Sequence, residues 1–156
     1  MKAIYLYNKL KYGIGTPTHI GIIIDVKKNG DPIIAEVLNS FVIRTHEVWQ
    51  LDEWLKNGDI EIGECTKSLK GIDKCVADDL GKPYGYLDLL AIALTFLFKF
   101  KIVKATGATK VICSEAVARA IKECNGLDIS KDLDKSMDLI TPIDLYRWDK
   151  VKILTP

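Results

Sequence analysis

The sequence has no marked excess of charge of either sign. Its 156 residues contain 22 Lys and Arg against 21 Asp and Glu, which gives a net charge of +1. Proteins that bind nucleic acid or an anionic lipid surface electrostatically carry a clear basic excess. We therefore expect no nucleic-acid partner and no membrane binding that depends on charge alone.

The chain also lacks an apolar run long enough to cross a membrane. The longest uncharged apolar run is Leu89–Phe98, with ten residues, whereas a spanning helix needs about 20. The first residues contain neither the apolar core nor the small-residue cleavage site of a signal peptide, so we expect a cytoplasmic protein. We expect a buried helix over the apolar run; the alternative is a helix that contacts a membrane through Lys99, Lys101 and Lys104.

Metal-binding patterns are equally scarce. The chain has four Cys and two His, and no two Cys form a CxxC pair. Structural zinc sites draw their ligands from closely spaced Cys and His, so we expect neither a metal site nor another cofactor. Without a secretion signal, reduced thiols are the default and disulfides the alternative for Cys65, Cys75, Cys113 and Cys124.

The composition is that of an ordinary globular protein. Apolar residues make up 48% of the chain and charged residues 28%, which excludes the disordered and low-complexity classes. No internal repeat and no linker-like stretch divides the sequence. At this length we expect one domain that covers residues 1–156.

Periodicity predicts the secondary structure. Alternating and β-branched segments indicate strands, and segments with helical spacing indicate helices. Because strands and helices are segregated rather than alternating, the pattern favours an α+β fold with an antiparallel sheet packed against helices. The expected strands are 2–7, 18–26, 32–38, 41–45, 60–64 and 146–154, and the expected helices are 52–58, 72–80, 87–98 and 113–123.

Cys113 is the leading candidate for a catalytic residue. It follows the apolar pair Val111-Ile112 and lies where a helical pattern begins. The positive end of the helix dipole and the unpaired N–H groups there favour the thiolate, which is the nucleophilic form. The same N–H groups can hold an oxyanion during acyl transfer. The alternative is an inert buried cysteine.

A nucleophilic thiol needs a base, and the chain offers only His19 and His46. His19 lies in the expected strand 18–26, where alternation places it on the same face as Gly21. We take His19 as the base, with a purely structural sheet histidine as the alternative. His46 follows a weaker strand, and we expect it to have a surface or loop role.

Glu36 is the candidate for orienting the imidazole, because it is an acidic residue within an otherwise apolar strand. A tight two-residue Asn-Gly turn would pair it with Ile23, on the same face as His19 but four residues away, roughly 13 Å. We therefore expect an irregular hairpin, with a bulge or an asymmetric loop between Val26 and Ile33. The alternative is a carboxylate that faces solvent.

The order of the motifs resembles a known family. A His-Gly strand is followed by a strand glutamate, a Gly-x-Pro-Tyr segment, a helix-start Cys and a Thr-Pro-x-Asp motif. Together they resemble the circularly permuted branch of the NlpC-type papain-like cysteine hydrolases, the YiiX-like group related to lecithin–retinol acyltransferase, in which His precedes Cys. The motifs lie at Thr18–Ile22, Ile34–Val37, Gly81–Tyr86, Cys113–Ala120 and Thr141–Leu145.

The resemblance implies a permuted papain-like fold, with an antiparallel sheet or partial barrel packed against helices and the nucleophile at a helix N-terminus. It implies Cys113 as nucleophile, His19 as general base and Glu36 as the residue that orients the imidazole. Tyr84 matches the Gly-x-Pro-Tyr position and would line the substrate cleft, with a packed aromatic as the alternative. Ser114 matches by motif, but we interpret it as a helix-start hydroxyl rather than a catalyst.

The activity we expect is hydrolysis of an amide bond, in a peptide or a peptidoglycan fragment, through an acyl-enzyme on Cys113. One alternative is an acyltransferase or lipid esterase with the same Cys–His chemistry, for which the segment 87–98 would contact lipid. The other is a non-catalytic binding or structural protein that keeps the fold while Cys113 is inert.

Overall fold

The strands form one open antiparallel sheet. The computed structural model describes residues 3–7, 19–85 and 111–154, and within them six strands lie in the order β4-β3-β2-β1-β5-β6. All neighbouring pairs run antiparallel, and the sheet does not close into a barrel. The strands are β1 (Ala3–Tyr7), β2 (His19–Val26), β3 (Pro32–Val37), β4 (Phe41–Thr45), β5 (Ile60–Cys65) and β6 (Val151–Leu154).

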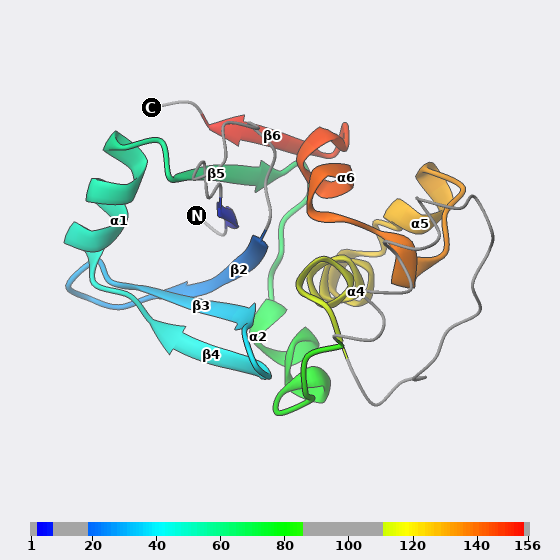
Figure 1. Ribbon diagram of the computed structural model, residues 1–156, viewed down its shortest axis with the longest axis horizontal. Coiled ribbons are helices and arrows are strands. Elements are labelled where there is room, and N and C mark those ends of the chain that lie inside the picture. Colours follow the sequence, from blue (N-terminus) through cyan, green and yellow to red (C-terminus); the bar gives the residue numbers. More distant parts are fainter. Residues whose placement is uncertain (1–2, 8–18, 86–110, 155–156) are drawn as a thin grey trace.

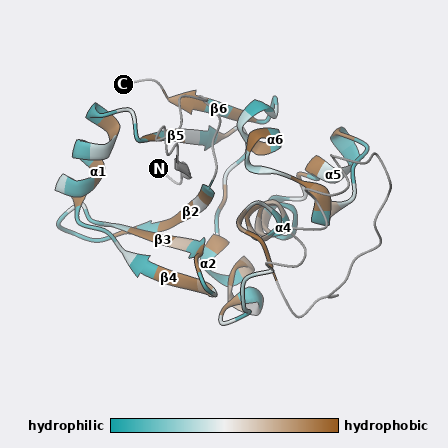
Figure 2. Cartoon of the chain, in the orientation of Figure 1, coloured by the Kyte–Doolittle hydropathy of each residue, from teal (hydrophilic) through white to brown (hydrophobic). Residues whose placement is uncertain are grey.

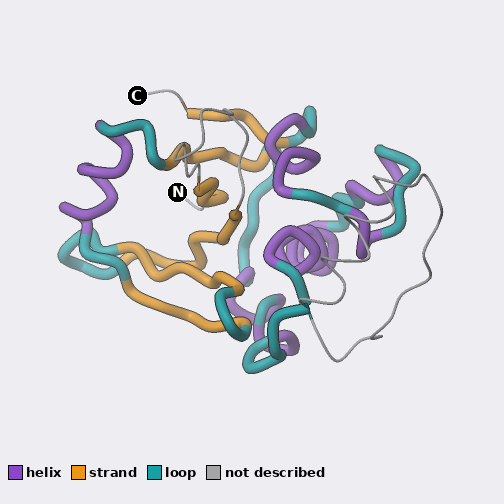
Figure 3. Tube along the Cα trace, viewed as in Figure 1, coloured by secondary structure: helices purple, strands orange, loops and turns teal. Residues whose placement is uncertain are grey.

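Most of the helices gather on one side of the strands. Figure 1 shows α4, α5 and α6 grouped together, whereas α1 lies at the opposite end of the molecule. Figure 3 shows the same segregation of helix from strand, which confirms the α+β class. The helices are α1 (Val48–Lys56), α2 (Ile72–Cys75), α4 (Cys113–Asn125), α5 (Ile129–Asp132) and α6 (Pro142–Arg147), with the 3-10 helices η1 (Ala77–Asp79) and η3 (Met137–Leu139).

The predicted last strand, 146–154, is wrong in its first half: residues 146 and 147 belong to α6, and β6 begins only at Val151. The cause is a capping box that starts this helix: the Asp144 carboxylate accepts a hydrogen bond from the Thr141 N–H at 2.8 Å, and the Asp144 N–H donates to Thr141 Oγ1 at 3.4 Å. Pro142 occupies the first turn, where its fixed φ suits a helix. These local signals outweigh the β-branched residues that follow.

The other predicted elements differ mainly at their ends. α1 begins at Val48, before the predicted 52–58, and the predicted helix 72–80 is divided into α2 and η1. The predicted helix 113–123 is confirmed as α4. The predicted apolar helix 87–98 lies outside the described residues.

β2 is buried on both of its faces and forms the centre of the core. Ile20 and Ile22 face the larger hydrophobic cluster, to which α4 contributes, and both are fully buried. On the opposite face Ile23 packs with Ile34 of β3 and Leu51 of α1 in a second, smaller cluster. Figure 2 shows the hydrophobic residues along β2 and β3 that supply both layers. A polar side chain on either strand must therefore find its partners inside the protein.

The hairpin between β2 and β3 is irregular, as predicted, although its bulge lies in β2 rather than in the connection. The pairing steps from Ile23 with Ile34 to Asp25 with Ile33, so one strand has an extra residue there. The connection of residues 27–31 is also longer than a two-residue turn. Together these irregularities shift the register.

The shifted register pairs Glu36 with Gly21 instead of Ile23, and a glycine is needed at this point. A Cβ atom built on Gly21 would lie 3.0 Å from Ile34 Cγ2, 3.2 Å from the Ala35 carbonyl oxygen and 3.3 Å from Glu36 Cβ. Any side chain at residue 21 would therefore press on the strand that carries Glu36. Gly21 thus allows β3 to approach β2 closely where the carboxylate lies.

We expect the Gly21→Ala variant to lose about 1–3 kcal/mol of its free energy of unfolding, because the added methyl group overpacks the hairpin. Urea unfolding measures the loss. Gly126→Ala is the matched control: it places the same methyl group at a positive φ of 75° with nothing within 4 Å, so it adds backbone strain without crowding Glu36. Unchanged stability in Gly21→Ala would contradict the assigned close approach.

Candidate active site

β2 and β3 bring His19 and Glu36 together. Glu36 pairs with Gly21, so His19 is its diagonal neighbour on the same face, at a separation of about 7–8 Å that long side chains can span. His19 Nε2 lies 3.3 Å from Glu36 Oε2. Glu36 is only 5% exposed, which excludes the alternative of a carboxylate that faces solvent.

His46 also contacts Glu36, which sequence reasoning missed. His46 lies in the connection between β4 and α1, as expected, but its side chain is only 17% exposed and its Nε2 lies 3.2 Å from Glu36 Oε1. Its ring packs edge-on against Trp54 of α1, with centroids 5.9 Å apart and planes inclined by 65°. The expected surface role is therefore wrong: one buried carboxylate links both histidines of the chain.

Cys113 is the first residue of α4 and is 4% exposed. Its helix follows the extended residue Ile112, which has no side-chain acceptor to cap the first turn. The first N–H groups of α4 therefore point toward the end of the helix at which the sulfur lies. The predicted location of Cys113 at a helix N-terminus is confirmed.

The imidazole of His19 joins the thiol to the carboxylate. Burial alone would lower the pKa of His19, but hydrogen bonds to Cys113 and to Glu36 outweigh burial and raise this pKa to about 9. Burial would likewise raise the pKa of Glu36, but the hydrogen bonds from His19 and His46 outweigh it and hold the pKa of this carboxyl below its usual range. At neutral pH an imidazolium therefore faces a carboxylate within the protein.

Tyr84 lies in a short extended segment beside the strand-like residue that precedes α4. Its N–H donates to the Asn39 carbonyl at 2.9 Å, and residue 84 forms a bridge with Val111, two residues before Cys113. The Tyr84 ring is partly buried and packs against the larger core cluster, which accords with the packed-aromatic alternative. A contact of this ring with substrate stays a prediction.

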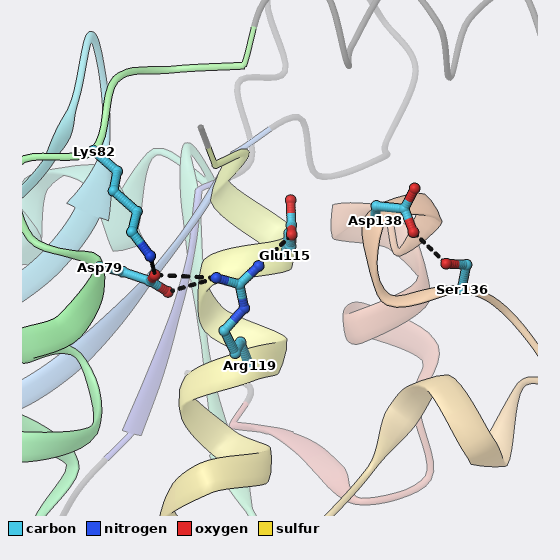
Figure 4. Close-up of polar contacts among 6 residues, drawn as sticks. All are labelled: Asp79, Lys82, Glu115, Arg119, Ser136 and Asp138. Carbon is cyan, nitrogen blue, oxygen red and sulfur yellow. Dashed lines mark hydrogen bonds and ion pairs between the residues drawn. The ribbon is translucent and has the colours of Figure 1, made fainter. Parts of the chain in front are cut away.

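An ion network fixes this segment to α4. Figure 4 shows the Arg119 guanidinium between Asp79 and Glu115, while Lys82 reaches Asp79 from the other side. Arg119 Nη1 lies 3.1 Å from Asp79 Oδ1, and both carboxylates are buried. Arg119 thereby also offsets the negative charge of Glu115 in the first turn of α4, a charge that would otherwise oppose a thiolate at Cys113.

Ser114 is used for structure. Its side chain is fully buried, and its hydroxyl donates to the Ile140 carbonyl at 2.6 Å. This bond ties the start of α4 to the segment that leads into α6. The interpretation of Ser114 as a structural hydroxyl accords with this contact.

A cavity of about 420 Å³ lies at the turn between β3 and β4. Leu38, Val42 and Arg44 are among its lining residues. Val42 is the β4 partner of Glu36, and Asn39, also in the lining, accepts the backbone hydrogen bond of Tyr84. This open cavity therefore lies beside the β3–β4 pairing that includes residue 36 and beside the segment that contains Tyr84.

The described part of the chain contains no cluster of three His, Cys, Asp or Glu residues arranged to bind a metal ion. The four cysteines are all free thiols. Within residues 3–7, 19–85 and 111–154, no helix has the length and apolar character that a membrane crossing requires. No family model, curated protein or solved structure matches the chain.

We expect the imidazole of His19 to titrate with a midpoint near pH 9. Because this pKa lies above the unfolded value of about 6.5, the stability that the ring contributes is fully present below about pH 6.5 and is lost as the pH rises through about 9. Imidazole NMR resolves the titration simply, since the chain has only two histidines, and a His46 variant assigns the signals. A midpoint at or below 6.5 would contradict the His19 contacts with Cys113 and Glu36.

Proposed function

We propose that this protein is a thiol-dependent hydrolase that cleaves an amide bond through an acyl-enzyme on Cys113, on a permuted papain-like fold. The observation that carries the proposal is the chain of contacts from Cys113 through His19 to Glu36. A nucleophile, a base and a group that orients the base form the constellation that acyl transfer requires. All three come from different elements of the fold, namely α4, β2 and β3.

The protonation states favour an ion pair before substrate binds. A ring with a pKa of about 9 is protonated at neutral pH and cannot accept a proton from a neutral thiol. In the proposed mechanism Cys113 attacks as the thiolate, which the adjacent imidazolium of His19 stabilises. A carboxylate only accepts hydrogen bonds, so His19 Nε2 keeps its proton toward Glu36 and Nδ1 exchanges the other proton with sulfur.

In the acylation step the Cys113 sulfur attacks the carbonyl carbon of the substrate. A C–S bond forms and the carbonyl electron pair moves to oxygen, where the first N–H groups of α4 stabilise the oxyanion. The electron pair then returns, the C–N bond breaks, and the proton on His19 Nδ1 passes to the leaving amine. The products of this step are a thioester and a neutral imidazole.

Deacylation uses the same residues in the opposite direction. Once sulfur is acylated, His19 loses its interaction with the thiolate, which contributes to its raised pKa. The neutral ring can then take a proton from water while the water oxygen attacks the thioester carbonyl. Cleavage of the C–S bond releases the carboxylic acid and restores the thiolate–imidazolium pair.

Two other functions remain as alternatives to be tested. An acyltransferase or lipid esterase would use the same acyl-enzyme and differ in the acceptor or in the bond cleaved. A non-catalytic binding or structural protein would keep the fold with an inert Cys113. The buried charges at His19 and Glu36 support the catalytic proposals, because an inert cysteine requires neither.

We expect iodoacetamide at pH 6.5 to label Cys113 before the other three thiols. Exposure alone predicts the opposite order, since Cys113 is buried whereas Cys75 and Cys124 are partly exposed; only activation by His19 favours Cys113. Peptide mapping over time gives the order. The His19→Ala variant should label Cys113 more slowly by up to about 10²-fold, because a thiol with the ordinary pKa of about 8.5 is only about 1% thiolate at pH 6.5. Slower labelling of wild-type Cys113 than of Cys124 would argue for the inert alternative.

Glu36→Gln should keep the fold and lower both the alkylation rate of Cys113 and the titration midpoint of His19. The amide retains a hydrogen-bond acceptor but loses the charge that stabilises the imidazolium. Alkylation of Cys113 and NMR titration measure the two effects. Glu64→Gln, in an exposed position of β5, is the control for the loss of one negative charge, and an equal effect of both variants would remove Glu36 from the mechanism.

A further inference from the structure

His46 contacts Glu36 together with His19, but the proposed mechanism does not use it. Its Nε2 and that of His19 approach different oxygens of Glu36, at 3.2 Å and 3.3 Å. An ionised carboxylate has no proton to donate, so both ring nitrogens act as donors. Each oxygen of Glu36 therefore receives one imidazole N–H.

The surroundings hold the His46 ring in place. Its ring and that of Trp54 in α1 lie in a T-shaped arrangement with centroids 5.9 Å apart, and its backbone N–H donates to the Pro32 carbonyl at 3.0 Å. The ring thus packs against α1, while the backbone of His46 is fixed to the start of β3. A Glu side chain, by contrast, has three rotatable bonds and is not fixed by its own backbone.

We propose that His46 is a positioning residue, whose Nε2–H holds Glu36 Oε1 so that Oε2 faces His19. The proposal rests on the proposed function, because it is through His19 that His46 would affect Cys113. Without the His46 donor the carboxylate can turn away from His19 or exchange its partner for water. The orientation of the base thus depends on a residue in the connection between β4 and α1.

Three variants separate hydrogen bonding from packing. His46→Gln keeps an N–H donor and loses the ring, His46→Phe keeps a ring against Trp54 and loses the donor, and His46→Ala loses both. Circular dichroism and urea unfolding establish that each variant is folded. If His46 positions Glu36 by its hydrogen bond, the His46→Gln variant should behave like the wild type in the two readouts below. If His46 acts by packing alone, the His46→Phe variant should do so instead.

The first readout is the NMR titration of His19, which is the only imidazole left in all three variants. We expect the midpoint to fall from about 9 toward the ordinary value in His46→Phe and His46→Ala, and to stay close to the wild type in His46→Gln. Wild-type behaviour of His46→Phe would overturn the proposal. This readout needs no catalysis, so it tests His46 even if the chain proves not to be a hydrolase.

The second readout is the rate of Cys113 alkylation. Loss of the donor should slow it by about tenfold, as expected when a hydrogen bond to a charged group is removed, and His46→Gln should restore most of the rate. If wild-type Cys113 is not activated, or if His19→Ala labels equally fast, the proposed function fails. If activation depends on His19 but His46→Phe retains it fully, only the role of His46 fails.

Discussion

The buried carboxylate of Glu36 is the constraint on which the rest of the site depends. A charge on the central strands of a sheet is costly unless donors surround it, and Glu36 is 5% exposed. His19 and His46 provide one donor for each of its oxygens. The position of His19 toward Cys113, the register of β2 with β3 and the fixed connection before α1 all serve this one group.

Most of the secondary structure could be predicted from the sequence, because hydrophobic periodicity determines which segments form strands and helices. The five strands before residue 66 and the helix that starts at Cys113 follow from alternation, β-branching and the apolar stripe of α4. The misassignment of α6 was avoidable, since Thr141 and Asp144 form a recognisable capping box with Pro142 between them. The register was not readable in detail, because a bulge depends on packing between two strands rather than on one of them.

The site was predictable where chemistry restricts the choice of residues. Cys113 is the one cysteine at a helix start, and only two histidines exist, so the pairing with His19 and Glu36 could be proposed. His46 was missed because the strand before it has a weak pattern and because its partner, Glu36, lies ten residues away in the sequence. The neighbouring residues in the sequence, Glu47 and Trp49, do not indicate that His46 is buried. The contact arises from tertiary packing on Trp54, which no local pattern contains.

The buried charges of His19 and Glu36 are not explained by stability alone. Replacing a buried ion pair by well-packed apolar side chains is often neutral or stabilising, and β2 and β3 are otherwise apolar on the face that carries His19 and Glu36. Stability alone would therefore favour a valine or isoleucine at residue 36. The second buried network, from Asp79 through Arg119 to Glu115, likewise surrounds the first turn of α4 rather than the distant end of the sheet. The first set lies beside Cys113 through the contact of His19 with this thiol, and the second lies on the helix that begins at Cys113. The proposed function requires charges in these places, because it uses Cys113 as a nucleophile and not merely as a buried side chain.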